Sequence, residues 1–357
     1  MTTRVLIMAG GTGGHVFPAL AVADELKSQH VDVAWMGTQR GIEAKLVPAS
    51  GYPLNFISIQ GLRGNGILGW LLAPFKLIKA VVEAVSVIKQ FKPDAVLGLG
   101  GFASGPGAVA AKLMGTPLVI HEQNAIPGLT NRLSALFANH VLEGFSGSFK
   151  NIRHAQYIGN PVRESIEELD RPQQRMVDRN STIRILVLGG SLGAKSLNTL
   201  LPEAFGLLET ELEIKHQCGV KHSDDCKHNY EVAGVEADVI TFIDDMSEVY
   251  AWADLVICRA GALTIAELAA AGVASLLVPY PYAVDDHQTH NASVLVNNGA
   301  AVLVQEKNLT IESFAEEISK LVGDRTLLLT MAIQARKQAK TGTAKLISAL
   351  CLEVAHG

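Results

Sequence analysis

The sequence predicts an α/β fold of two doubly wound, Rossmann-like domains that face each other across a cleft. At 357 residues the chain is long enough for two ordinary domains. Continuous apolar runs such as "RVLIMA" alternate with helical patterns such as "PALAVADELKSQ", which is typical of parallel sheets covered on both faces. Midway along the chain the pattern restarts, because "ILVLGGSLGAKSL" repeats the strand, glycine loop and helix of "VLIMAGGTGGHVF".

Ten short apolar, β-branched runs are the predicted strands. They are residues 4–9, 31–37, 54–59, 94–100, 117–122, 183–190, 213–219, 238–243, 254–261 and 274–279. The polar stretch 164–182 lacks apolar periodicity, so we expect an exposed connection there. The predicted domains are therefore 1–162 and 163–340. Residues 341–357 are predicted to form a last helix, which can pack on the second domain or return to the first.

Composition excludes several classes of protein. A formal net charge of −5 argues against a nucleic-acid-binding protein. The four cysteines are scattered without a C-x-x-C pair, which is typical of a reduced, cytosolic chain. The first residues resemble a strand rather than a signal peptide, and no apolar run reaches the ~18 residues of a membrane span.

The glycine loop "GGTGGH" (10–15) favours an anion but fits neither common nucleotide motif. Val16 stands where a dinucleotide fingerprint needs glycine, and no G-K-[ST] follows as in a P-loop. Similar loops occur at 98–107 and 189–194. Three such loops suit a protein that binds two diphosphates, one on each of two substrates, although a tight turn without ligand is the alternative for any one loop.

A second signature is "CRAGALTIAELAAAG" (258–272). A helix that starts near Thr264 would place Glu267 in its first turn, where the carboxylate can accept both hydroxyls of a ribose. The alternative is a capping box between Thr264 and Glu267. Asp286, His287, Gln288 and Asn291 of the polar loop 278–292 suit sugar hydroxyls. Arg163 can clamp a phosphate or be an ordinary surface arginine.

Together these segments resemble the MurG family of bacterial peptidoglycan synthesis. The resemblance rests on eight motifs in order: "GGTGGHVFPALA", "GLGGFASGPG", "HEQNAIPGLTNR", "IGNPVR", "GGSLGA", "FIDDM", "RAGALTIAE" and "DDHQTHNA". It implies the two-domain GT-B architecture and an inverting transfer of GlcNAc from UDP-GlcNAc to the MurNAc 4-hydroxyl of lipid I. The products would be lipid II and UDP.

The resemblance also implies residue roles. Residues assigned to UDP-GlcNAc are Thr12, Gly13, Gly14, Asn124, Arg163, Ser191, Ile243 (through its backbone), Ala262, Leu263, Thr264, Ile265, Ala266, Glu267 and Gln288. Residues assigned to the diphosphate of the acceptor are Gly100, Gly101, Ser104 and Gly105. The loop before Gln288 varies within the family, so its path stays open.

The transfer needs a base for the acceptor hydroxyl and positive potential at the leaving diphosphate. His15, at the turn into the first helix, is the predicted base or positions the hydroxyl, and Glu122 is the second candidate. A phosphate contact or a cap is the alternative for His15. No cofactor and no metal are expected: there is no D-x-D, consecutive aspartates point apart, and "HQCGVKHSDDCKH" (216–228) matches no common zinc spacing.

An apolar segment suggests where the enzyme works. Leu68, Trp70, Leu71, Leu72 and Phe75 form a patch bordered by Arg63, Lys76 and Lys79. This composition predicts a peripheral anchor on the cytoplasmic leaflet of the cell inner membrane, where lipid I lies, and a buried core helix is the alternative. Contacts with other cell-wall and division proteins stay open. The competing functions are a UDP-GlcNAc 2-epimerase of the same architecture and a non-catalytic UDP-sugar-binding protein.

Overall fold

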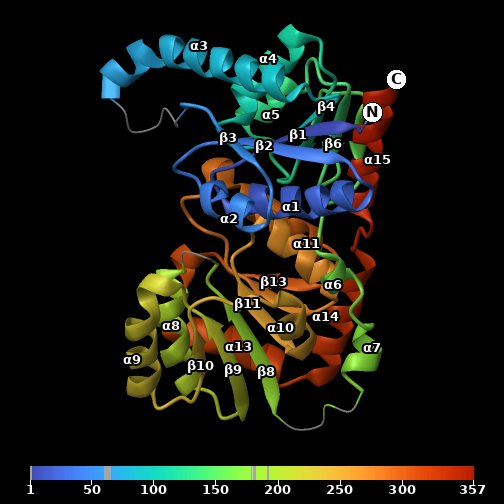
Figure 1. The fold of residues 1–357 in the computed structure, drawn as a ribbon. Coiled ribbons are helices and arrows are strands. Elements are labelled where there is room, and N and C mark those ends of the chain that lie inside the picture. The colour runs from blue at the N-terminus through green and yellow to red at the C-terminus, as the bar shows by residue number, and fades with distance from the viewer. Residues whose placement is uncertain (1, 60–65, 178, 180–181, 191–192) are drawn as a thin grey trace. The chain divides into compact units, whose positions relative to one another are not determined.

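The chain folds into two compact α/β units, each with one parallel sheet between layers of helices (Figure 1). The computed structural model describes residues 2–59, 66–177, 179, 182–190 and 193–357. Unit 1 comprises Met1–Val162 with Gly342–Gly357, and unit 2 comprises Arg163–Thr341. The predicted class, two doubly wound α/β domains with parallel sheets, is therefore confirmed.

Unit 1 contains a seven-stranded sheet in the order β3-β2-β1-β4-β5-β6-β7. Its elements are β1 (Arg4–Ala9), α1 (Gly13–Ser28), β2 (Asp32–Gly37), α2 (Glu43–Ala49), β3 (Leu54–Phe56), α3 (Gly66–Phe91), β4 (Ala95–Gly100), α4 (Ser104–Met114), β5 (Leu118–Glu122), α5 (Leu129–Ser134), β6 (His140–Glu143), β7 (Ala155–Tyr157) and α15 (Thr343–His356). The order reverses between β1 and β4, and this switch point is where doubly wound sheets bind ligands.

The alternation of side chains along β1 builds two cores in unit 1. Val5 and Ile7 pack on one face with α1 and α15, whereas Leu6 and Met8 pack on the other face with α3 and α4. All four side chains are fully buried. A continuous apolar strand is therefore needed at this position, as the sequence predicts.

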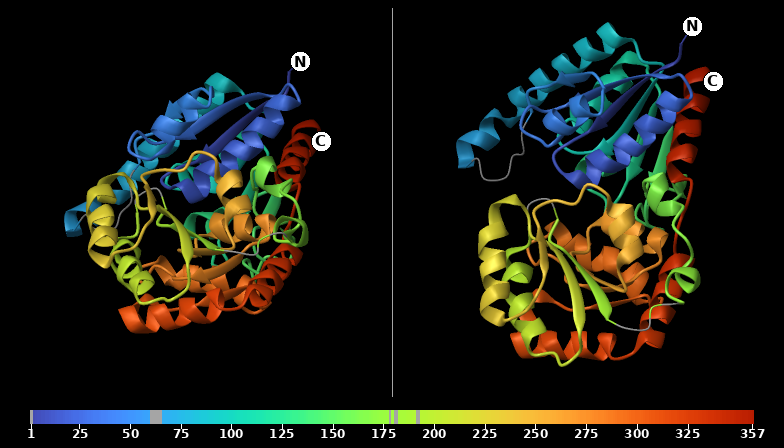
Figure 2. Two further views of the ribbon diagram at one scale, coloured as in Figure 1. Left: turned by 90° about the horizontal axis from the view of Figure 1, so that it is seen from below. Right: turned by 60° about the horizontal axis from the view of Figure 1, so that its bottom comes forward.

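The last helix belongs to unit 1. Ile347 of α15 lies in the same core as α1, and the hydroxyl of Thr343 donates to the carbonyl oxygen of Ile158 at 2.9 Å. The two ends of the chain consequently lie side by side, with Thr3 Oγ1 3.3 Å from Nε2 of His356 (Figure 2).

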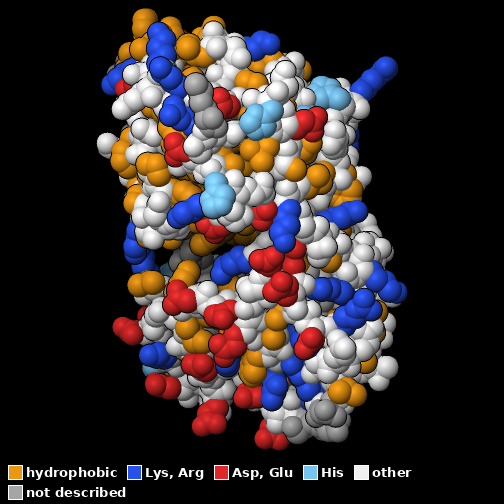
Figure 3. All heavy atoms as spheres, turned by 45° about the vertical axis from the view of Figure 1, so that its right-hand side comes forward, with side chains coloured by type: hydrophobic (Ala, Val, Ile, Leu, Met, Phe, Trp, Pro, Cys, Tyr) orange, Lys and Arg blue, Asp and Glu red, His pale blue; other side chains and the backbone are white. Residues whose placement is uncertain are grey.

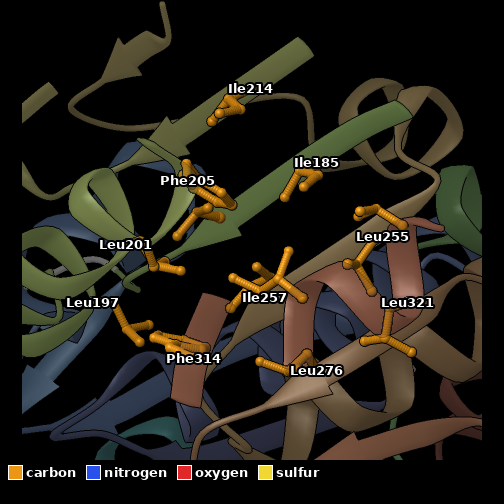
Figure 4. Close-up of a cluster of buried hydrophobic side chains, with 14 of the residues drawn as sticks. Ile185, Leu197, Leu201, Phe205, Ile214, Leu255, Ile257, Leu276, Phe314 and Leu321 are labelled. Atoms are coloured by element: carbon orange, nitrogen blue, oxygen red, sulfur yellow. The ribbon is translucent and has the colours of Figure 1, made fainter. Parts of the chain in front are cut away.

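Unit 2 contains a six-stranded sheet in the order β10-β9-β8-β11-β12-β13, with its switch point between β8 and β11. Its elements are α6 (Glu164–Glu167), α7 (Pro172–Arg175), β8 (Ile183–Leu188), α8 (Lys195–Gly206), β9 (Leu212–Gln217), η1 (Val220–His222), α9 (Ser223–Ala233), β10 (Asp238–Ile240), α10 (Met246–Trp252), β11 (Leu255–Cys258), α11 (Ala262–Ala271), β12 (Ala274–Leu277), η2 (Val284–Asp286), α12 (His287–Val296), β13 (Ala301–Leu303), η3 (Glu306–Asn308), α13 (Ile311–Val322) and α14 (Arg325–Lys337). Ile185, Ile257 and Leu276 line the core beneath α8 and α13 (Figure 4).

The described residues of the connection 164–182 form more contacts than its polar sequence suggests. The connection contains α6 and α7, and two of its arginines, Arg175 and Arg179, donate to backbone carbonyls of unit 2. Arg175 donates to Tyr250, Ala271 and Gly272, and Arg179 forms an ion pair with the buried Asp254 at 2.7 Å. These bonds attach the connection to the ends of α10 and α11, so it is not a free linker.

The surface mixes both signs of charge. On the face drawn in Figure 3, Lys and Arg side chains lie among Asp and Glu side chains rather than in one basic field. Among the helices that the structure describes, none is long and apolar enough to cross a membrane.

Candidate active site

Two glycine loops of unit 1 meet at the switch point of its sheet. The β1–α1 loop carries Gly10, and the β4–α4 loop carries Gly100 and Gly101 at positive φ (109° and 89°). A Cβ on Gly101 would overlap the carbonyl oxygen of Gly10, and one on Gly100 would lie 2.8 Å from Cδ2 of His15. The loops therefore touch only because these residues lack side chains.

His15 lies in the first turn of α1, beside the second glycine loop. Its Nδ1 is 3.3 Å from Oγ1 of Thr12, the N-cap residue, whose side chain does not cap the helix. The backbone N–H groups of His15 and Val16 donate to the carbonyl of Thr12, whereas the amides of Gly13 and Gly14 begin the helix without an intrahelical acceptor. The predicted base and the predicted donor-binding amides thus occupy one turn.

In the predicted site for the acceptor diphosphate, the Ser104 side chain is already engaged within the protein, so the groups that remain for a ligand are backbone amides. Ser104 is buried, and its hydroxyl donates to the carbonyl oxygens of Met8 (2.9 Å) and Gly100 (2.7 Å). The side chain therefore ties α4 to the sheet. The amides of Ser104 and Gly105, at the start of α4, remain as the groups that suit an anion.

Glu122 organises a loop rather than presenting a base. Its buried carboxylate accepts hydrogen bonds from the amide and the side chain of Asn124 (2.9 and 3.1 Å), the amide of Gly128 (3.1 Å) and the side chain of Asn131 (2.9 Å). A carboxylate engaged by four donors is poorly placed to take a proton from a substrate. This geometry gives Glu122 the role of holding Asn124 and favours His15 over it as the base, and the assignment of Glu122 as second candidate base stays a prediction.

His121, which precedes Glu122 in β5, is also unsuited to proton transfer. His121 is fully buried between the carbonyl oxygen of Gly159 (2.8 Å from Nε2) and the side chain of Gln123 (3.0 Å from Nδ1). Burial lowers its pKa to about 4, so the ring is neutral at neutral pH.

In unit 2, Glu267 is a buried carboxylate in α11, near its N-terminus. The helix begins at Ala262 with Gly261 as N-cap, so Glu267 lies in the second turn, and both the first-turn prediction and the capping box with Thr264 are wrong. The hydroxyl of Tyr250 donates to its Oε2 at 3.0 Å. Burial raises the pKa of Glu267 to about 6, against the opposing effects of the Arg163 charge and the Tyr250 hydrogen bond.

Arg163 and Ile243 lie at the same edge of unit 2. Arg163 donates to the carbonyl oxygen of Asp244 at 3.3 Å, and its charge acts on Glu267. The amide of Ile243 donates to Oε1 of Gln217 at 3.1 Å. Gln217, which is absent from the predicted site, therefore engages this amide, and the backbone contact between Ile243 and the uracil edge stays a prediction.

Gln288 has a defined amide orientation. Its Oε1 accepts from the amides of Ala260 (3.2 Å) and Tyr280 (2.9 Å), which leaves its NH₂ group as the donor toward a ligand. Arg259 supports the same loops, because it donates to the carbonyl oxygens of Val278 (3.1 Å) and Pro279 (3.2 Å), and it also pairs with Glu306. Ser191 lies outside the described residues.

The described residues contain no group of three or more His, Cys, Asp or Glu arranged for a metal. Asp245 instead caps α10 by accepting from the amides of Ser247 (2.9 Å) and Glu248 (3.2 Å). In the segment 216–228, His216 is buried against Tyr230 (2.9 Å) and Asn198 (3.0 Å), and burial lowers its pKa to about 3. These residues serve packing and capping.

The chain is similar to known glycosyltransferases over nearly its whole length. The model of the glycosyltransferase family 28 N-terminal domain matches residues 5–143, and that of the C-terminal domain matches residues 184–347. A protein of Nitrosococcus oceani, named UDP-N-acetylglucosamine–N-acetylmuramyl-(pentapeptide) pyrophosphoryl-undecaprenol N-acetylglucosamine transferase, is 53% identical over 100% of both chains. The crystal structure of MurG from Acinetobacter baumannii has a TM-score of 0.85 at 41% identity, over 98% of this chain and 99% of that chain. The chain belongs to the MurG family.

Other relatives agree with the MurG assignment. A protein of Aeromonas hydrophila with the same name is 51% identical over 100% of this chain and 98% of its own length. A UDP-GlcNAc 2-epimerase from Neisseria meningitidis has a TM-score of 0.67 at 14% identity, over 98% of this chain and 100% of that chain, which shows a shared fold alone. The resemblance inferred from eight motifs is confirmed, and so is the GT-B-like class.

Proposed function

We propose that this enzyme transfers GlcNAc from UDP-GlcNAc to the MurNAc 4-hydroxyl of lipid I, giving lipid II and UDP. The observation that carries the proposal is the full-length identity of 53% to a protein named for this transfer. The geometry of each unit supports it. Unit 2 presents groups for a nucleotide sugar, and unit 1 presents a histidine beside glycine loops.

Unit 2 suits UDP-GlcNAc by three features at one edge of its sheet. The buried Glu267 offers a carboxylate for the ribose hydroxyls, and Gln288 offers an NH₂ group for the sugar. The N-terminus of α11, whose N-cap Gly261 has no side chain to cap it, leaves backbone amides for the diphosphate. Arg163, whose positive charge acts on Glu267, is our candidate for stabilising the diphosphate of the leaving UDP.

Unit 1 suits the acceptor. Inversion at C1 of GlcNAc requires that the 4-hydroxyl attacks as UDP departs and that a base takes its proton. We assign His15 to this role, because it lies in the α1 turn over Gly100, at the carboxyl edge of the sheet. The amides that start α4 are our candidates for the acceptor's diphosphate.

We also propose that one face of unit 1 binds the anionic inner leaflet as a peripheral surface. Leu68, Trp70, Leu71 and Arg63 of the predicted patch lie outside the side chains that the structure describes, but Leu72 and Phe75 are 44% and 71% exposed. Exposure at these two positions favours an anchor over the buried-core alternative. The helix α3 nevertheless has a buried face, which includes Ala80, Ala84 and Ile88.

The apolar surface extends beyond the predicted patch to the neighbouring helices α4 and α5. Exposed apolar side chains on the three helices are Leu72, Phe75, Leu77, Ile78, Val82, Val109, Leu113, Met114, Leu129 and Leu133. Exposed basic side chains on the same helices are Lys76, Lys79, Lys89, Lys112 and Arg132. Apolar groups for the acyl boundary and cations for anionic lipid headgroups are the two components of interfacial binding.

The decisive experiment measures transfer of radiolabelled GlcNAc from UDP-GlcNAc to a lipid I analogue, together with UDP release. We expect both to require the acceptor. UDP release without acceptor would favour the 2-epimerase, with which the chain shares its fold. Binding of UDP-GlcNAc without any product would favour a sugar-nucleotide sensor.

A further inference from the structure

A buried glutamate that no part of the proposed chemistry uses lies directly beneath the first glycine loop. Glu43 is the first residue of α2 and is 0% exposed. Its Oε2 accepts from the amide of Gly11 at 2.8 Å, and its Oε1 accepts from the amide (2.9 Å) and the hydroxyl (2.8 Å) of Thr38. One carboxylate thus joins the loop after β1 to the loop after β2.

Three glycines make room for this side chain. A Cβ on Gly10, Gly37 or Gly41 would overlap the carboxylate or the Cγ of Glu43. These glycines come from both loops that the carboxylate joins, and for none of the three is a positive φ the reason for glycine. The space is therefore shaped for a carboxylate of this length.

The contact with Gly11 determines which amides of the loop face outward. Gly11 has φ of +88°, and its N–H is directed at Glu43, away from any ligand on the other side of the loop. The loop then enters α1, whose first turn contains Gly13, Gly14 and His15. Because Gly101 packs on Gly10, a displacement of this loop would also disturb the second glycine loop.

We propose that Glu43 is a positioning residue for the transfer reaction: it holds the 10–14 loop so that His15 is aligned with the acceptor hydroxyl and the amides that begin α1 with the GlcNAc of the donor. The proposal rests on the function proposed above. Glu43 touches neither substrate in this role. Its loss should therefore lower kcat, whereas UDP affinity, which we assign to unit 2, should not change.

The test uses full-length Glu43→Gln, which keeps the shape but turns an NH₂ group against an N–H or O–H donor of Gly11 or Thr38. We expect kcat with UDP-GlcNAc and a lipid I analogue to fall roughly tenfold or more, while UDP affinity measured by calorimetry stays within about twofold. The matched control is Tyr52→Phe in the same unit. It removes a hydrogen bond to the carboxylate of Asp24 (2.6 Å) but leaves the glycine loops in place.

A second variant keeps the test decisive if Glu43→Gln does not fold. Gly41→Ala retains the carboxylate of Glu43, but the added Cβ would overlap it and displace it from Gly11 and Thr38. This variant should therefore lower kcat in the same way. Unchanged kcat in the folded variants, or a kcat loss equal to that of Tyr52→Phe at the same loss of thermal stability, would overturn the positioning role. Loss of UDP affinity in parallel with kcat would overturn it too. Wild-type protein that transfers no GlcNAc would instead overturn the proposed function.

Discussion

Replacing Glu267 with Gln is expected to stabilise unit 2 while weakening UDP binding. Burial raises the pKa of this carboxyl from 4.5 to about 6, even though Arg163 and Tyr250 favour its ionised form. The folded state therefore binds the proton more tightly than the unfolded chain does. An ionised carboxylate at this position opposes folding at neutral pH.

The size of the effect follows from the pKa difference. The interval between 4.5 and about 6 corresponds to about 2 kcal/mol. Within it the folded state binds more protons than the unfolded state, so stability falls as pH rises through this window and stays lower above it. Gln remains neutral and can still accept the Tyr250 hydroxyl. The variant should therefore gain up to about 2 kcal/mol at pH 7–8, a gain that vanishes near pH 4.

UDP binding should change in the opposite direction. A neutral amide replaces a charged acceptor of the ribose hydroxyls, and such a loss costs about 1.5–3 kcal/mol, roughly a tenfold to hundredfold weaker Kd. This combination of greater stability and poorer binding distinguishes a ligand-binding carboxylate from a structural one.

The assay pairs calorimetry of UDP binding with urea unfolding at pH 7–8 and near pH 4. Hydrogen exchange in α11 measures the stability of unit 2 separately from that of unit 1. Glu203→Gln, an exposed glutamate on α8, is the matched control and should change neither property. A Glu267→Gln protein that is less stable at pH 7–8, or that binds UDP as tightly as the wild type, would refute the reasoning.

Three further predictions follow from the same geometry. His15→Ala should lower kcat by roughly 10²–10⁴ with little change in UDP affinity, as steady-state kinetics and calorimetry can show. Tyr250→Phe removes the hydrogen bond that lowers the pKa of Glu267, so this carboxyl should become protonated at a higher pH. As the pH is lowered, calorimetry should therefore find that UDP binding weakens at a higher pH in the variant than in the wild type. Changing Phe75 and Ile78 to Ser should reduce sedimentation with anionic vesicles yet preserve transfer to a water-soluble acceptor.

Each of these predictions has a clear contrary result. A His15 variant that loses donor affinity but keeps its kcat would make this residue a substrate contact. If the pH at which UDP binding weakens is the same in Tyr250→Phe as in the wild type, the tyrosine contributes packing and does not set the pKa of Glu267. Unchanged vesicle binding would leave the apolar face of α3 without a membrane role.

Local sequence predicted the strand and loop design well because buried parallel strands need continuous apolar residues. β1 and β4, which carry the two glycine loops of unit 1, were recognised on that basis. β6, β7 and β13 were not among the ten predicted strands. They have only three or four residues each, and two of them lie at sheet edges, so they lack the long apolar run that identifies a central strand.

The start of α11 shows where local rules fail. Thr264 and Glu267 have the spacing of a capping box, but the N-cap of α11 is Gly261, three residues before Thr264. Propensity favours the threonine as a cap. The chain enters α11 directly from β11, however, so its start is determined by sheet geometry rather than by the best capping residue.

The sequence by itself determined two parallel α/β domains, the glycine loops at their strand ends and, through its ordered motifs, membership of the MurG family. These properties depend on residues close together in the chain. Only the tertiary structure decided what the acidic side chains do. Glu43, Glu122 and Glu267 are all buried, and each takes its role from donors that folding brings to it: Gly11 for the first, Asn131 for the second and Tyr250 for the third. A buried carboxylate is stable only where hydrogen-bond donors surround it, and those donors come from segments that sequence spacing does not relate.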